Sequence, residues 1–190
     1  MVAGLRMLLP PEYDVLTATD FLDFRFGDRK AELDNGVIRL MAGVTGRHGV
    51  VAGNILSALA ARLRGSGFGP YTSAMAVQTH ALSVRRPDIS VFPRHGSEDD
   101  DKTAFDNPVA LFEIASAGHC RTDLHMKLDE YRAVPSVDTI VLVDIATERV
   151  RVIQRTGPHD WTDVAHDEPV DIPLPMPNLT LPHTEMFARD

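Results

Sequence analysis

In one long segment of the chain, apolar residues recur every three to four positions, which is the spacing of one helix face. From His48 to about Arg64 this spacing predicts an amphipathic helix of about four turns. Gly65 and Gly67 follow and would end it. The second helix is expected over 122–133, with a threonine as N-cap and a proline shortly after its end.

Other segments show the alternation or the continuous apolar runs of strands. Asn35–Gly36 lies inside an alternating segment (31–40) and predicts a hairpin, because both turn residues must accept a positive φ. Further strands are expected at 71–79, 88–92, 109–114, 139–143 and 149–155, and a short capped helix at 17–22. After Trp161 the chain is rich in proline, and only its last dozen residues suggest a packed tail. The pattern predicts a mixed sheet flanked by two main helices, in a three-layer or open α/β architecture.

Composition is that of an ordinary soluble protein. The 190 residues suffice for one domain with a sizeable core, and 44% of them are apolar and 24% charged. No apolar run approaches the roughly 18–20 residues of a membrane span, and the N-terminus lacks the features of a secretory signal. A lone cysteine, Cys120, excludes an internal disulfide and a multi-thiolate zinc site, and favours the cytoplasm.

The net charge of −8 argues against broad binding of phosphate groups, since proteins that bind nucleic acids usually carry a basic face. Two considerations weaken this objection. Acidic metal ligands add to the negative count until a cation neutralises them. The acidic run at 98–101 is also typical of a solvated loop. The charge therefore makes a nuclease less expected without excluding it.

Two carboxylates stand out within apolar strands. Glu113 lies between Phe112 and Ile114, where a charge needs a partner or a task. Asp88 opens another apolar strand, directly after Pro87. If the two strands are neighbours, both carboxylates can point into one cleft. Together with a backbone carbonyl they would form a hard-oxygen site that suits Mg²⁺ or Mn²⁺.

Lys127, on the helix that follows, is the basic residue expected at this site. A bound divalent cation would polarise a phosphoryl oxygen and lower the pKa of a water molecule, while Lys127 stabilises developing charge or holds the attacking water. A structural interpretation exists as well, because Asp123 and Lys127 are spaced as an i,i+4 pair worth only about 0.2–0.5 kcal/mol. Tyr131, on the same helix face, is expected to be packed rather than catalytic.

The carboxylates have structural interpretations too. Asp88 could cap local backbone at the start of its strand. Glu113 could be half of a buried ion pair with Arg85 or Arg86. Taken one at a time, these residues leave the function open.

Taken together, the motifs resemble the Uma-type family of predicted restriction endonucleases, a branch of the PD-(D/E)xK nuclease superfamily. The resemblance runs from about residue 16 to 187 and is carried by 32–36, His48, 86–91, 113–116, 123–127, 131–137 and 141–144. In the superfamily's usual motif a lysine follows the second acid by two residues, where this chain has Ala115. The family's pattern places the lysine on the next helix, which matches Lys127.

The resemblance implies a restriction-endonuclease-like core of the α/β (α+β) class, with a central mixed sheet, flanking helices and an N-terminal hairpin. It implies one domain over 1–190, with a core at about 16–165 and a C-terminal tail at 166–190, and a homodimer. The residues it implies are Asp88, Glu113, Glu32 and the Ile114 carbonyl as metal ligands, and His48, Arg121 and Asp123 at the substrate cleft. The loop at 117–121 departs from the family's pattern, which puts its substrate contacts in question.

The sequence therefore predicts a cytoplasmic Mg²⁺-dependent (or Mn²⁺-dependent) endonuclease that hydrolyses DNA phosphodiester bonds with metal-activated water. One alternative is a catalytically inactive nuclease-fold module that binds nucleic acid or protein. Another is a two-carboxylate glycoside hydrolase, but that chemistry needs carboxylates about 5–9.5 Å apart with no paired lysine. Lys127 argues against it.

Overall fold

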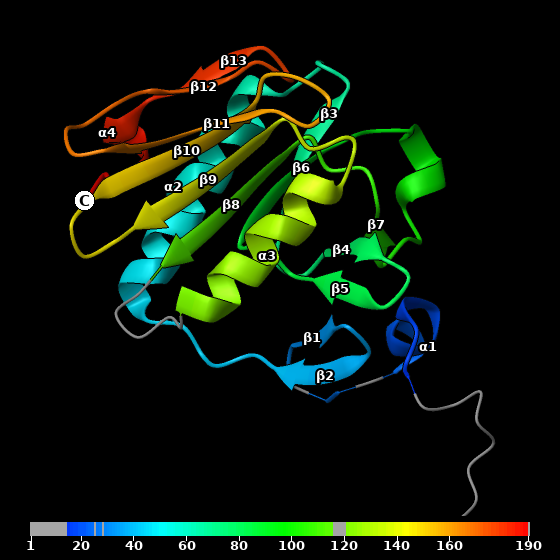
Figure 1. Cartoon of the computed structure of the whole chain (residues 1–190). Coiled ribbons are helices and arrows are strands. Elements are labelled where there is room, and N and C mark those ends of the chain that lie inside the picture. Colours follow the sequence, from blue (N-terminus) through cyan, green and yellow to red (C-terminus); the bar gives the residue numbers. More distant parts are fainter. Residues whose placement is uncertain (1–14, 25, 28, 116–120, 190) are drawn as a thin grey trace, which may run out of the picture.

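A computed structural model describes residues 15–189, apart from 25, 28 and 116–120, and apart from the side chains of 121–123. A six-stranded sheet forms its centre, with strand order β11-β10-β9-β8-β6-β3. The helices are α1 (Ala18–Asp23), α2 (Gly46–Arg62), α3 (Arg121–Ala133), α4 (His183–Met186) and the 3-10 turn η2 (Gly96–Asp99). The longest two, α2 and α3, cover opposite faces of this sheet (Figure 1).

The strands form three sheets. Those of the six-stranded sheet are β3 (Phe68–Thr72), β6 (Ile89–Pro93), β8 (Ala110–Ala115), β9 (Thr139–Asp144), β10 (Arg149–Arg155) and β11 (Trp161–His166). A five-stranded sheet, ordered β2-β1-β5-β4-β7, contains β1 (Ala31–Asp34), β2 (Val37–Leu40), β4 (Ala76–His80), β5 (Ser83–Arg85) and β7 (Ala104–Phe105). The two-stranded sheet pairs β12 (Ile172–Leu174) with β13 (Leu179–Leu181). Among the strands of the described residues, only β8–β9 and β4–β7 are parallel pairs.

Helix α2 forms where its periodicity predicts it. The Thr45 side chain caps the first turn by accepting from the backbone N–H of His48 at 3.3 Å. Val51, Ile55 and Leu59 are fully buried against the six-stranded sheet. Burial of this stripe, rather than intrinsic propensity, holds the helix in place.

The hairpin predicted at Asn35–Gly36 is confirmed. Asn35 has φ +47° and Gly36 φ +82°, and Asp34 pairs with Val37 across the turn. Strand β1 is buried along its length because it pairs with β2 on one side and β5 on the other, whereas β2 is exposed at the edge of its sheet. The acids of β1 therefore lie inside the protein.

Two predictions about strands were wrong. The segment expected as one strand at 71–79 is split between β3 and β4, which belong to different sheets. The Met75 N–H donates to the Thr72 carbonyl at 3.0 Å and turns the chain between them. After Trp161 the chain also forms β11, β12, β13 and α4, which the proline-rich pattern concealed. Strand β11 is largely exposed and held by its ladder to β10, so it lacks a buried apolar face.

Strands β6, β8 and β9 are central to the architecture. β8 pairs antiparallel with β6 and parallel with β9. Phe112 and Ile114 pack on the α2 side, and Leu111 packs on the α3 side, as the period of two predicts. The predicted mixed sheet with flanking helices is confirmed. No helix in the described part of the chain is long and apolar enough to cross a membrane.

Candidate functional site

Five of the residues predicted from the sequence line one cavity of about 240 Å³ at the end of β6 and β8. Asp88 directly precedes β6, Glu113 lies in β8, and Lys127 lies in α3. Glu32 of β1 and His48 of α2 complete the group. Of the other three predicted residues, Ile114 is not among the residues that line this cavity, and the side chains of Arg121 and Asp123 lie outside the described part of the chain.

Asp88 is held between a neighbouring strand and α2. Its Oδ2 accepts from the backbone N–H of Ile114 at 2.7 Å, and its Oδ1 lies 3.0 Å from Nε2 of His48. The register of β6 against β8, with Ile89 opposite Phe112, brings Asp88 beside Ile114. Asp88 therefore binds the backbone of the strand that carries Glu113, rather than capping its own local backbone.

His48 is buried at the N-terminal end of α2, and Asp88 changes its pKa. The hydrogen bond to Asp88 raises the pKa of His48, and the negative charges of Asp88 and Glu113 add to the rise, while burial opposes it. Nδ1 of the ring is buried and has no hydrogen-bond partner among the described residues. His48 thus faces the carboxylates of the site with one nitrogen only.

Two side chains of α3 contact Glu113. The Tyr131 hydroxyl donates to Oε1 of Glu113 at 2.6 Å, and Nζ of Lys127 lies 3.6 Å from the same oxygen. Lys127 and Tyr131 are one helical turn apart, so both point to the same face of α3. The pKa of Glu113 is raised to about 7, chiefly by burial and also by the charges of Asp88 and Glu32, while Lys127 opposes the rise.

Glu32 is held by three groups. Its Oε1 lies 3.0 Å from Nζ of Lys127 and accepts from the backbone N–H of Arg86 at 2.9 Å. Its Oε2 lies 3.6 Å from the guanidinium of Arg85. Lys127 therefore lies between two carboxylates, Glu32 and Glu113, which come from different sheets.

Arg85 forms a buried ionic network that sequence reasoning missed. Its guanidinium is completely buried and lies 2.8 Å from Asp34 and 2.6 Å from Glu130. The predicted alternative of an ion pair between Glu113 and Arg85 or Arg86 is not formed, because Arg85 binds Glu32, Asp34 and Glu130, while Arg86 donates to backbone carbonyls. The available signal was Glu32 and Asp34, two residues apart on β1 and hence on one face.

The donor set fits a hard divalent cation. In the described ranges, no three His, Cys, Asp or Glu side chains are gathered as a ready-made metal cluster, so a cation here would rely on Asp88, Glu113 and backbone oxygen. The site nevertheless concentrates negative charge, since Glu32, Asp88 and Glu113 line the same cavity. A cation would offset the burial and repulsion that keep the pKa of Glu113 near 7.

Known proteins resemble this chain in sequence and in fold. A family model described as "Uma2: Putative restriction endonuclease" matches residues 18–184. The "Uncharacterized protein sll1609" of Synechocystis sp. is 24% identical over 158 residues, which cover 82% of this chain and 89% of that protein. The crystal structure of "a putative nuclease belonging to DUF820" from Anabaena variabilis superimposes with a TM-score of 0.74 at 20% identity, covering 90% of this chain and 97% of the other. The crystal structure supports the fold, and the family match supports a nuclease function in general.

Proposed function

This chain belongs to the Uma2 family, and on that premise we propose that it is a divalent-metal-dependent endonuclease that hydrolyses DNA phosphodiester bonds. The observation that carries the proposal is the convergence of Asp88, Glu113 and Lys127 on one cavity. They come from a pre-strand turn, a central strand and a helix, and only the tertiary fold brings them together. Buried charges without a stabilising role would be selected against on energetic grounds.

Asp88 and Glu113 would hold the cation, Mg²⁺ or Mn²⁺, because carboxylate oxygens are the ligands that such hard cations prefer. When bound, a divalent cation polarises a phosphoryl oxygen and lowers the pKa of water. The hydrogen bonds from Ile114 N–H and His48 to Asp88 orient that carboxylate. Tyr131 does the same for Glu113.

Lys127 supplies the positive charge for the phosphate. The residue is only 8% exposed, so the interaction of its ammonium with a phosphoryl oxygen is weakly screened by solvent. Glu32 positions the ammonium, since its Oε1 lies 3.0 Å away. In this assignment Glu32 serves Lys127, and a direct contact of Glu32 with the cation is the alternative to be tested.

The acting form we propose is a homodimer, because cutting both strands of a duplex needs two sites. The exposed edge strand β2 offers a surface for self-association, with Val37 58% and Leu40 52% exposed. Sedimentation analysis of the protein and of Val37→Lys tests this separately from catalysis. A monomer at all concentrations would refute the dimer and leave the nuclease proposal intact.

Cleavage of supercoiled plasmid tests the nuclease assignment. The protein should nick DNA with Mg²⁺ or Mn²⁺ and not with EDTA, and Asp88→Ala, Glu113→Gln and Lys127→Ala should each lose at least about 100-fold in rate. Glu168→Gln, an exposed acid outside the site, is the matched control and should cut normally. Equal activity in all variants would identify a contaminant and refute the assignment.

Calorimetric titration with Mg²⁺ separates the enzyme from an inactive module. Binding that Asp88→Ala abolishes, together with cleavage, supports the enzyme. Binding of DNA without cation binding or cleavage would instead establish a nuclease-fold module that has lost turnover.

A further inference from the structure

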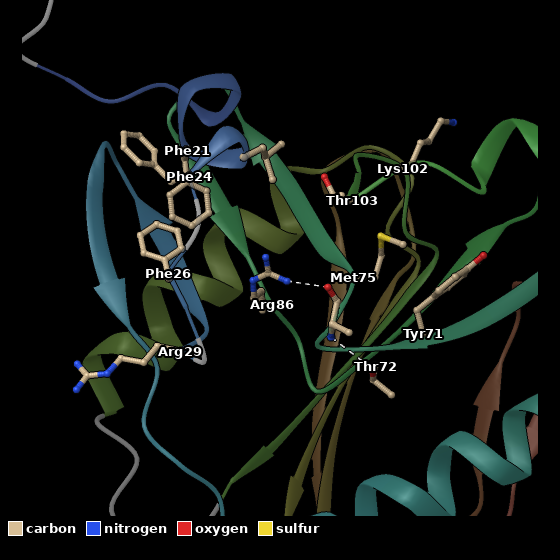
Figure 2. Close-up of a pocket in the computed structure, with 12 residues that line it drawn as sticks. Phe21, Phe24, Phe26, Arg29, Tyr71, Thr72, Met75, Arg86, Lys102 and Thr103 are labelled. Carbon is tan, nitrogen blue, oxygen red and sulfur yellow. Dashed lines mark hydrogen bonds between the residues drawn. The ribbon is translucent and has the colours of Figure 1, made fainter.

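A second cavity, of about 410 Å³, lies between the segment around α1 and the turn from β3 to β4. Figure 2 shows the rings of Phe21, Phe24 and Phe26 on one side and Tyr71 and Met75 on the other, with Arg86 between them. Phe24 is 49% exposed, so its ring is available to a ligand as well as to its neighbours. We call this cavity, defined by Phe24, Phe26, Tyr71, Arg29, Arg86 and Lys102, the aromatic–basic pocket.

The charge of this pocket is opposite to that of the protein. Arg29, Arg86 and Lys102 line it, and no described carboxylate does, although the chain carries a net charge of −8. Arg86 is committed to the carbonyls of Ala31 and Ala74, and Lys102 is bound to Asp99 at 2.9 Å. Arg86 is thereby fixed in the wall of the pocket with its charge unneutralised by these carbonyls, while Asp99 offsets part of the charge of Lys102.

Aromatic walls combined with cations are suited to a nucleotide. The face of a base stacks on aromatic rings, and arginine adds a cation–π contribution and binds phosphate. The side chain of a bound peptide would use the rings but not the cations. A paired base stays stacked in its duplex, so the base that enters must be unpaired, in a single strand or extruded.

The aromatic–basic pocket is connected to the candidate metal site. A cavity of about 730 Å³ lies between them; it shares Arg29 and Thr72 with the pocket and His48 and Asp88 with the metal site. Figure 2 shows the Arg29 guanidinium pointing away from the rings, which suits a phosphate better than a base. Along these cavities the lining residues are first the aromatic rings, then the guanidinium of Arg29, and then the carboxylates that would hold the cation beside a phosphodiester.

We propose that the aromatic–basic pocket is a nucleobase subsite, which takes one unpaired base of the strand whose phosphodiester lies at Asp88 and Glu113, with Arg29 on an intervening phosphate. The inference rests on the proposed nuclease function and adds a substrate feature to it. Phe24 and Arg29 are binding residues in this scheme, and neither takes part in the chemistry.

A binding cycle in EDTA tests the subsite without any cleavage. Single-stranded oligonucleotides carry 2-aminopurine, or an abasic residue, at successive positions, and are titrated with the parent protein and Phe24→Ala. We expect 2-aminopurine to be quenched at one position and Phe24→Ala to weaken binding roughly tenfold. With the abasic residue at that position the parent should weaken by the same factor, and Phe24→Ala should then cost nothing more.

Three further variants give the cycle its controls. Phe24→Trp keeps a stacking surface and should retain binding, which separates stacking from misfolding. Arg29→Ala should reduce the slope of log affinity against log salt by about one and leave the quenching unchanged. Arg64→Ala removes the same charge beyond the end of α2, where it lines none of the three connected cavities, and should change neither.

The outcomes distinguish this proposal from the nuclease assignment. Coupling between Phe24 and one base, with no plasmid cleavage, supports the subsite and refutes the nuclease. The protein could instead cleave DNA with metal while the losses of affinity from Phe24→Ala and from the abasic residue simply add, or while no position is quenched. Either result overturns the subsite alone. Failure of the parent protein to bind any oligonucleotide overturns the subsite as well.

Discussion

The Tyr131 hydroxyl donates a hydrogen bond of 2.6 Å to Oε1 of Glu113. Tyr131 is completely buried, so this bond is made away from solvent, where an unpaired hydroxyl or carboxylate would be costly. It also fixes an acid whose pKa lies near neutrality. The state of Glu113 is therefore controlled by helix α3, which also carries Lys127.

Removing the Tyr131 hydroxyl should shift the pH dependence of cleavage. The hydrogen bond from Tyr131 lowers the pKa of Glu113, which burial has raised to about 7. In Tyr131→Phe the pKa rises further, and Glu113 must lose its proton to hold a cation, so the acidic limb of the pH–rate profile should move to higher pH. Stability should fall by only about 1 kcal/mol, as denaturant unfolding would confirm. An unmoved limb would contradict a role for Glu113 in holding the cation.

Glu32→Gln distinguishes two roles for this carboxylate. If Glu32 positions Lys127, as their 3.0 Å contact suggests, cleavage should slow by about tenfold to 100-fold while the affinity for Mg²⁺ is nearly retained. The measurement is a Mg²⁺ titration beside the plasmid assay, with Glu168→Gln as control. A loss of Mg²⁺ affinity as large as that of Asp88→Ala would instead make Glu32 a metal ligand.

Arg85→Ala should be among the most destabilising substitutions. It removes the buried counter-charge of Glu130 and one of the counter-charges of Asp34 and Glu32, and breaking such a network by removing one partner costs about 3–5 kcal/mol. Arg149→Ala, which removes an exposed partner of Asp167, should cost at most about 1 kcal/mol. Urea unfolding of both variants gives the comparison. Similar losses in the free energy of unfolding would show that the buried network stabilises the fold no more than an exposed ion pair does.

His48 should make the stability of the metal-free protein depend on pH. Its pKa is raised above the ordinary value of 6.5, chiefly by the hydrogen bond to Asp88. The pair therefore stabilises the fold fully below the unfolded pKa, and this contribution disappears as pH rises through the folded pKa. His48→Gln should reduce that decline, to which the raised pKa of Glu113 also contributes, measured as the free energy of unfolding from about pH 5.5 to about pH 8.5. Parallel curves for the two proteins would refute it.

Local sequence determined those features that depend on neighbours along the chain. The periodicity of α2, the Asn35–Gly36 turn and the two faces of β8 were all predicted, because side-chain period and turn chemistry act within a few residues. Glu113 stood out for the same reason, as an acid inside an apolar strand. The division of 71–79 between two sheets was not predicted, since alternation alone does not tell which sheet a strand joins.

Only the tertiary structure decided how the charges are paired. Lys127 and Glu32 are 95 residues apart, and Arg85 reaches Asp34 and Glu130 across 51 and 45 residues. Pairings of this kind depend on which elements meet in space and how far they exclude water, and neither is written in local patterns. The sequence thus identified the acids and the lysine that could do chemistry, and the fold determined which partner holds each one.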